Sequence, residues 1–100
     1  MSQLSIIEQR PGYFLIEGPL TFASIDKKTV KSFNFLNSAE QICIDLGHVE
    51  TTDSAGLALM IEWIKQSRQY NTRLSFKNIP PQLLTLAKLS GFDNNEYFVG

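Results

Sequence analysis

The stretch Thr51–Leu57, with the sequence TTDSAGL, carries the densest functional signal in this chain. Asp53 precedes a helical pattern and is a natural N-cap, because its carboxylate can accept a backbone N–H two or three residues further on. Ser54, Ala55 and Gly56 would form the first turn, whose free N–H groups favour negative charge. Gly56 would also let another surface approach the backbone closely. The stretch therefore predicts either a well-capped helix alone or, in addition, a docking or phosphate-accepting surface at the helix N-terminus.

The enzyme class to weigh first is a serine hydrolase with Ser54 as its nucleophile. Such a nucleophile needs a histidine base and an acid that orients it, and His48 is the only histidine in the chain. Ser54 also lacks the Gly-x-Ser-x-Gly elbow, because Thr52 and Gly56 flank it. Glycine-rich phosphate loops are missing as well. We therefore predict a protein with no catalytic residues and no nucleotide or other cofactor.

A metal site is the next alternative, since Asp45, His48, Glu50 and Asp53 lie close together in the sequence. Their spacing matches no structural zinc pattern, and sites for hard cations usually need more oxygen ligands. We expect no metal site. Instead, Asp45 should hydrogen-bond the loop after its strand, and His48 should lie exposed on that loop. Cys43, the single cysteine, should pack as a small hydrophobic side chain in the sheet.

Length and composition describe one ordinary globular domain over residues 1–100, with 43% hydrophobic and 19% charged residues. The net charge of −1 provides no basic field for nucleic acid or an anionic membrane surface. The longest apolar run, Leu57–Ile61, is far shorter than the ~20 residues that span a bilayer. Met1–Arg10 has no basic residue before its apolar positions, so we do not expect it to act as a secretory signal. We expect a cytoplasmic protein without direct membrane insertion.

Four or five strands must position these residues. Pro11-Gly12 joins the first two as a β-hairpin turn, and Gly18-Pro19 should end the second strand. The third strand has little alternation, as expected when both faces are covered, whereas the fourth alternates like a half-buried edge strand. The predicted strands are Leu4–Glu8, Tyr13–Glu17, Gln41–Leu46, Arg73–Lys77 and, as an optional short last strand, Glu96–Val99.

Helical spacing predicts about three helices, at about Phe22–Leu36, at Ser54 to about Tyr70, and from Pro80-Pro81 to a stop at Gly91. The order is therefore β-β-α-β-α-β-α, with the optional final strand. This alternation indicates an α/β fold with a mixed four- to five-stranded sheet. Ligands and partners of such sheets gather beyond the carboxyl ends of the strands, so the expected loop Gly47–Asp53 is the place to look.

Trp63 lies on a second apolar strip of the central helix, together with Leu59 and Tyr70. This strip could pack against a neighbouring helix, which we favour. It could also be exposed as a protein-binding patch, where Trp and Tyr often anchor a partner.

The central part of the chain resembles the STAS domain. The resemblance rests on Ile42–Leu46, Val49 and Asp53–Leu57, and it continues through Arg73–Phe76 and Leu83–Phe92. STAS is the fold of anti-sigma-factor antagonists and of the cytoplasmic tails of sulfate transporters. The resemblance therefore implies a STAS fold and a role in binding another protein.

A narrower resemblance is to the small STAS (MlaB-like) subunits of Mla phospholipid ABC transporters. It is carried by Gly56–Leu59 together with Thr85–Leu89. It implies a non-catalytic subunit that binds the cytoplasmic ATPase, with the permease in the full complex, and so lies peripherally on the inner membrane. Whether the domain self-associates stays open. The implied partner-binding residues are Thr52, Asp53, Ser54, Ala55, Gly56, Leu57, Ala58 and Trp63.

One position departs from the antagonist pattern. Anti-sigma-factor antagonists carry their phosphorylated hydroxyl residue immediately before the motif glycine, and here that position is Ala55. Ser54 is the only hydroxyl residue between Asp53 and Gly56, and is thus the one candidate phospho-acceptor there. The departure favours the transporter subunit over the alternative function, an anti-sigma-factor antagonist that binds a kinase-like partner.

Overall fold

The computed structural model describes residues 4–21, 25, 34–91 and 97–99. Within these residues five strands form one sheet, in the spatial order β1-β2-β3-β4-β5. The β1–β2 pair is antiparallel, and the other neighbours are parallel. The strands are β1 (Ser5–Arg10), β2 (Tyr13–Leu20), β3 (Gln41–Thr52), β4 (Arg73–Lys77) and β5 (Phe98–Val99).

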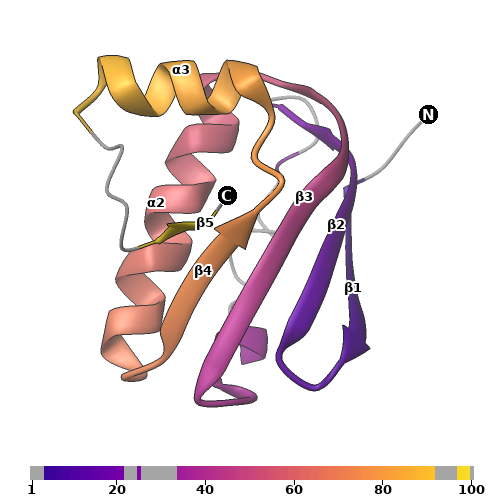
Figure 1. Cartoon of the computed structure of the whole chain (residues 1–100), viewed down its shortest axis with the longest axis vertical. Coiled ribbons are helices and arrows are strands. Elements are labelled where there is room, and N and C mark those ends of the chain that lie inside the picture. Colours follow the sequence, from indigo (N-terminus) through magenta and orange to yellow (C-terminus); the bar gives the residue numbers. More distant parts are fainter. Residues whose placement is uncertain (1–3, 22–24, 26–33, 92–96, 100) are drawn as a thin grey trace.

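Two α-helices, α2 (Ser54–Gln69) and α3 (Pro81–Leu89), and the short 3-10 helix η1 (Asn34–Asn37) complete the described part. Figure 1 shows α2 lying along one face of the sheet and α3 across the end where β3 finishes. The predicted α/β class and mixed sheet are thus confirmed. Most of the helix predicted at Phe22–Leu36 falls on residues 22–24 and 26–33, outside the described residues, and its described end forms η1.

The core lies between the sheet and α2, because alternate strand residues point to this side. Trp63 is its largest member, is fully buried, and lies 6.0 Å from the Phe35 ring and 6.3 Å from the Phe76 ring, between centroids. Leu59 is also buried, and Tyr70 is half-buried. The strip that contains Trp63 therefore packs inside the protein. The interpretation of Trp63 as an exposed partner-binding residue is wrong.

β3 is longer than predicted. It has 12 residues and continues through the stretch that we expected to be the loop Gly47–Asp53. The reason is its neighbour, because β2 also continues past Gly18-Pro19 to Leu20 and pairs with β3 as far as Thr52. Gly18 is buried and has φ +93°, and two irregularities in register lie on either side of it. Glycine at this positive φ lets the strand bend and continue instead of ending.

The predicted hairpin turn and the predicted end of the last helix are confirmed. The β1–β2 hairpin turns at Pro11-Gly12, where Gly12 has φ +81°, and Gly91 follows α3 with φ +71°. β4 alternates as predicted, but it is an edge strand only in its first part, because β5 pairs with Phe76 and Lys77. None of the helices in the described part of the chain combines the length and the apolar character needed to cross a bilayer.

Candidate functional site

The N-terminal end of α2 has the capped geometry that its sequence predicts. Asp53 is extended, with φ −145° and ψ −166°, and its Oδ1 accepts a hydrogen bond from the Ala55 backbone N–H at 2.9 Å. The Asp53 carbonyl accepts the Gly56 N–H at 3.0 Å, and the Asp53 N–H donates to the Leu20 carbonyl at 3.4 Å. Two of the first free N–H groups of α2 are therefore satisfied within the chain, and the cap is tied to the end of β2.

Gly56 serves internal packing. A Cβ at this position would lie 2.5 Å from Thr52 Oγ1 and 2.7 Å from the Leu20 carbonyl oxygen. Since real Cβ atoms do not come so close to other atoms, α2 can approach the end of β2 only because residue 56 is glycine. The close approach that we expected Gly56 to offer a partner is made instead by β2 of the same chain.

The motif residues divide into an inner and an outer set. Thr52, Gly56 and Leu57 are buried, with Thr52 and Leu57 only 7% and 6% exposed. Asp53 and Ala55 are half-buried, whereas Ser54 and Ala58 are exposed. The surface that remains for a partner is therefore smaller than the full set of predicted residues.

The exposed side of α2 continues beyond the predicted motif. Ile61 is half-buried rather than fully buried, and Lys65 Nζ lies 3.5 Å from Glu62 Oε1 in an exposed ion pair. Ser54, Ala58, Ile61, Glu62 and Lys65 recur at three- and four-residue spacing and thus share one side of the helix. We refer to Ser54, Ala55, Ala58, Ile61, Glu62 and Lys65 as the outer face of α2. Helical spacing from Ser54 onward was the signal that could have identified Ile61 and Glu62.

Asp45 forms the centre of a polar network on β3. Its Oδ2 accepts the Tyr13 hydroxyl at 2.7 Å, and its Oδ1 accepts the Gly47 backbone N–H at 2.8 Å and the Asn78 side-chain amide at 3.0 Å. The predicted bond from Asp45 to the backbone that follows it is confirmed, although Gly47 belongs to the strand and not to a loop.

The Asp45 network changes two pKa values. Burial alone would raise the pKa of Asp45, but the hydrogen bonds from Tyr13, Gly47 and Asn78, together with the positive charge of Lys77, outweigh it and hold that pKa below its usual value. The hydrogen bond to Asp45, burial and the Asp45 charge raise the pKa of Tyr13 above its usual value. The charged carboxylate and the neutral phenol therefore stabilise each other.

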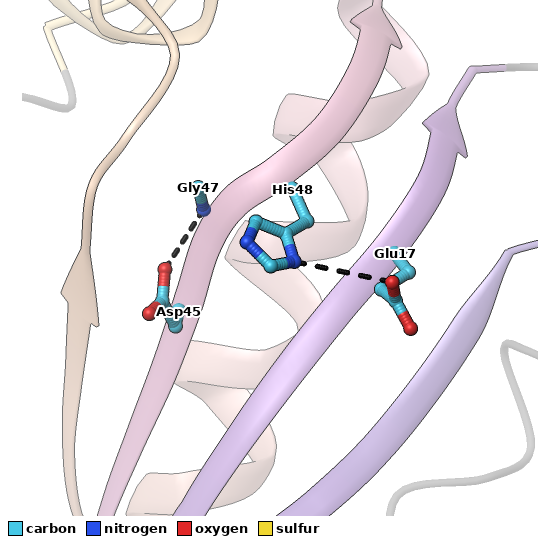
Figure 2. A network of polar contacts seen from close by, with 4 residues as sticks. All are labelled: Glu17, Asp45, Gly47 and His48. Carbon is cyan, nitrogen blue, oxygen red and sulfur yellow. Dashed lines mark hydrogen bonds and ion pairs between the residues drawn. The ribbon is translucent and has the colours of Figure 1, made fainter.

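His48 lies on β3 and not in a loop, but it is exposed as expected. Figure 2 shows its ring reaching toward β2, where Nδ1 lies 3.9 Å from Glu17 Oε2, while Asp45 is bonded to Gly47. His48 thus faces Glu17 and shows no hydrogen bond to Ser54 among the described residues. Nor does any group of three or more His, Cys, Asp or Glu side chains in the described part of the chain have the arrangement of a metal site.

The mixed sheet, with a capped helix after its long central strand, is the architecture of a STAS domain. The family model described as "Mlab, STAS domain" matches residues 16–100, and the chain belongs to this family. No curated protein sequence matches the chain. Among solved structures, the anti-sigma factor antagonist SpoIIAA in its unphosphorylated form is similar, with a TM-score of 0.65 and 15% sequence identity. The alignment covers 97% of this chain and 87% of that chain, and at this identity the likeness concerns the fold alone.

Proposed function

We propose that this chain is a non-catalytic accessory subunit that binds the cytoplasmic ATPase of a phospholipid ABC transporter. The observation that carries the proposal is the match of residues 16–100 to the family described by Mlab. Through the ATPase and its permease, the subunit would lie at the inner membrane. The likeness to SpoIIAA supports the STAS fold but favours no particular partner, since it rests on 15% identity.

The outer face of α2 is the surface that we assign to this docking. Its N-terminal part offers Ser54 and Ala58, two small exposed side chains, beside the half-buried Ala55. Small side chains let a partner helix pack close to the backbone of α2. The Asp53 carboxylate already accepts the Ala55 N–H and places a negative charge at the helix end. This charge disfavours the phosphate-accepting interpretation and supports docking of a protein.

Co-purification of the tagged chain from its native host tests the proposal. We expect an ATPase and a permease to co-purify with the wild-type chain, and Ala55→Arg and Ala58→Arg to abolish this binding because they place bulk and charge in the interface. Gln69→Arg is the matched control, since it adds the same side chain at the exposed far end of the same helix. Binding by Gln69→Arg should be unchanged. The exposed Ala58 and Gln69 variants should melt within about 4 °C of the wild type.

Two outcomes would overturn the proposal. If Ala55→Arg and Ala58→Arg bind the ATPase normally, the docking surface lies elsewhere. If the main partner is instead a kinase-like anti-sigma factor, the chain is an antagonist. Intact-mass measurement of the native protein, with peptide mapping of any phosphate, adds a second test. A substantial fraction phosphorylated at Ser54 would favour the anti-sigma-factor antagonist, since Ala55 replaces the residue that is phosphorylated in those proteins.

A further inference from the structure

The face of the sheet opposite α2 carries a row of side chains across four strands. The register pairs Arg10 of β1 with Tyr13 of β2, Tyr13 with Cys43 of β3, and Cys43 with Ser75 of β4. Arg73 lies two residues before Ser75 and therefore on the same face. The row lies near the starts of β2, β3 and β4, away from the end at which β3 leads into α2 (Figure 1).

These residues surround an open cavity of about 430 Å³. Arg10, Tyr13, Cys43, Arg73 and Ser75 line it, with backbone from the hairpin turn, and none of its described lining residues is acidic. Cavities of roughly 300–1,000 Å³ are typical of small-molecule sites. The cavity is thus larger than a bare inorganic anion needs, and two guanidinium groups give it positive charge.

The exposed Arg10 side chain lies over an aromatic ring in the absence of a ligand. Its guanidinium carbon lies 4.2 Å from the centre of the Tyr13 ring, and the Tyr13 hydroxyl is bonded to Asp45 at 2.7 Å. A cation over an aromatic face is attracted to it, so the ring positions the guanidinium at the cavity wall. This pre-organisation lowers the entropy that binding a ligand would otherwise cost.

The charge of both arginines is left uncompensated by carboxylates of the described residues. Only two ion pairs are present in that part of the chain, His48–Glu17 and Lys65–Glu62, and neither involves Arg10 or Arg73. Asp45 is engaged by three donors and does not line the cavity. Glu40 and Arg73 both line a neighbouring hollow, but no ion pair joins their side chains. An anionic group in the cavity would therefore meet two arginines that form no ion pair with the described residues.

We propose that this cavity binds the phosphate group of a small organic phosphate, with Arg10 and Arg73 as its charged contacts. Guanidinium forks match the oxygen geometry of phosphate, and two of them balance the two charges of a phosphate monoester. The Ser75 hydroxyl, two residues after Arg73 on the same face of β4, also lines the cavity and is a further donor. This site lies at the opposite end of the strands from the N-terminus of α2, so it is separate from the proposed docking surface and can be tested independently.

Titration of the ¹⁵N-labelled chain with glycerol 3-phosphate at constant ionic strength tests the site. We expect saturable shifts of the amide signals of Arg10, Tyr13, Cys43, Arg73 and Ser75. Arg10→Ala and Arg73→Ala should each weaken the affinity at least about tenfold, the loss expected for a hydrogen bond to a charged group. Lys88→Ala, which removes an exposed charge on α3, is the matched control and should bind normally. Thermal melting checks that the variants fold.

Cys43 provides a second readout, because it is the only cysteine and lines the cavity. Its alkylation by the uncharged reagent N-ethylmaleimide should slow as glycerol 3-phosphate is added, and should not slow with glycerol. A parallel sedimentation assay compares vesicles containing phosphatidylglycerol with vesicles of phosphatidylcholine alone. Arginine-dependent binding to the former without binding of glycerol 3-phosphate would identify a lipid headgroup as the source of the phosphate. The absence of arginine-dependent binding in both assays, or equal weakening by Lys88→Ala, would overturn the site.

Discussion

Gly56 and Asp53 act at the same helix end, but for different physical reasons. Asp53 supplies a hydrogen-bond acceptor that a peptide of a few residues could already use, at 2.9 Å from the Ala55 N–H. Gly56 matters because of Leu20 on β2, whose carbonyl oxygen would lie only 2.7 Å from a Cβ at residue 56. The role of Asp53 is explained by local chemistry, and the role of Gly56 is explained only by tertiary packing.

Gly56→Ala should therefore destabilise the protein although alanine favours helix. Alanine gains about 1 kcal/mol of helix propensity over glycine, but crowding a packed interior typically costs about 1–3 kcal/mol. Because the backbone carbonyl of Leu20 cannot rotate away, we expect a net loss of about 1 kcal/mol in urea unfolding. Ser54→Ala, an exposed change in the same turn, should be close to neutral. A Gly56→Ala variant as stable as the wild type would show that the end of β2 can shift away from the added Cβ at little energetic cost.

The Asp45 network predicts a defined dependence of stability on pH. The pKa of Asp45 is lowered in the folded state, so its contribution is fully present above the unfolded-state pKa and is lost as pH falls through the folded-state pKa. Tyr13→Phe removes one donor to Asp45 and should raise that pKa toward its usual value. The drop in melting temperature between pH 7 and pH 3 should therefore be smaller in Tyr13→Phe than in the wild type. An equal drop in both proteins would mean that Tyr13 does not stabilise the Asp45 carboxylate.

At the scale of elements, α2 joins the sheet to the proposed docking surface. Its inner side buries Leu57, Met60, Trp63 and Ile64 against the strands, and its outer face stays available. The N-cap holds the start of this helix at the end of β2, because the Asp53 N–H donates to the Leu20 carbonyl. Loss of the cap should thus affect both the stability of α2 and the position of Ser54 and Ala55.

Replacing Asp53 separates the contribution of its hydrogen bond to stability from that of its charge. Asp53→Ala should lower the free energy of unfolding by about 1 kcal/mol, because it leaves the Ala55 N–H without its acceptor. Asp53→Asn keeps an acceptor oxygen at the same place and should retain most of the stability in the same urea titration. If Asp53→Asn is as unstable as Asp53→Ala, charge and not hydrogen bonding explains the cap.

At the scale of the whole molecule, one core joins the sheet to the helices. Trp63 on α2 contacts the rings of Phe35, just before the third strand, and Phe76 on β4, so distant parts of the chain are packed around one indole. A core shared in this way predicts a single cooperative unfolding transition.

Trp63 is the only tryptophan in the chain and reports on this core directly. Its fluorescence should be blue-shifted in the native protein and should shift to the red in the same transition that far-UV circular dichroism records. Trp63→Ala should cost about 3–5 kcal/mol, a large part of the 5–15 kcal/mol of a typical domain, and should leave much of the chain unfolded. Trp63→Phe should cost less. Transitions that do not coincide would show that α2 and the sheet unfold separately.

Features that depend on a few neighbouring residues could be predicted from the amino-acid sequence alone. Pro11-Gly12 predicted the hairpin, Asp53 predicted the start of α2, and Pro81 and Gly91 predicted the limits of α3. In each case the cause is local, since it lies in an allowed backbone angle or in a hydrogen bond that spans two or three residues. The resemblance to the STAS pattern also predicted the family, which the match over residues 16–100 confirms.

Features that depend on contacts between distant residues were decided only in the folded chain. The extension of β3 depends on its pairing with β2, in which His48 stands opposite Glu17. Asp45 bonds to Tyr13 and Asn78, which are 32 and 33 residues away. Arg10, Arg73 and Ser75 line one cavity only because four strands are in register. Periodicity shows which residues share a face, but not which other element covers it. For that reason it favoured packing of Trp63 inside the protein but could not predict that Phe35 and Phe76 are its neighbours there.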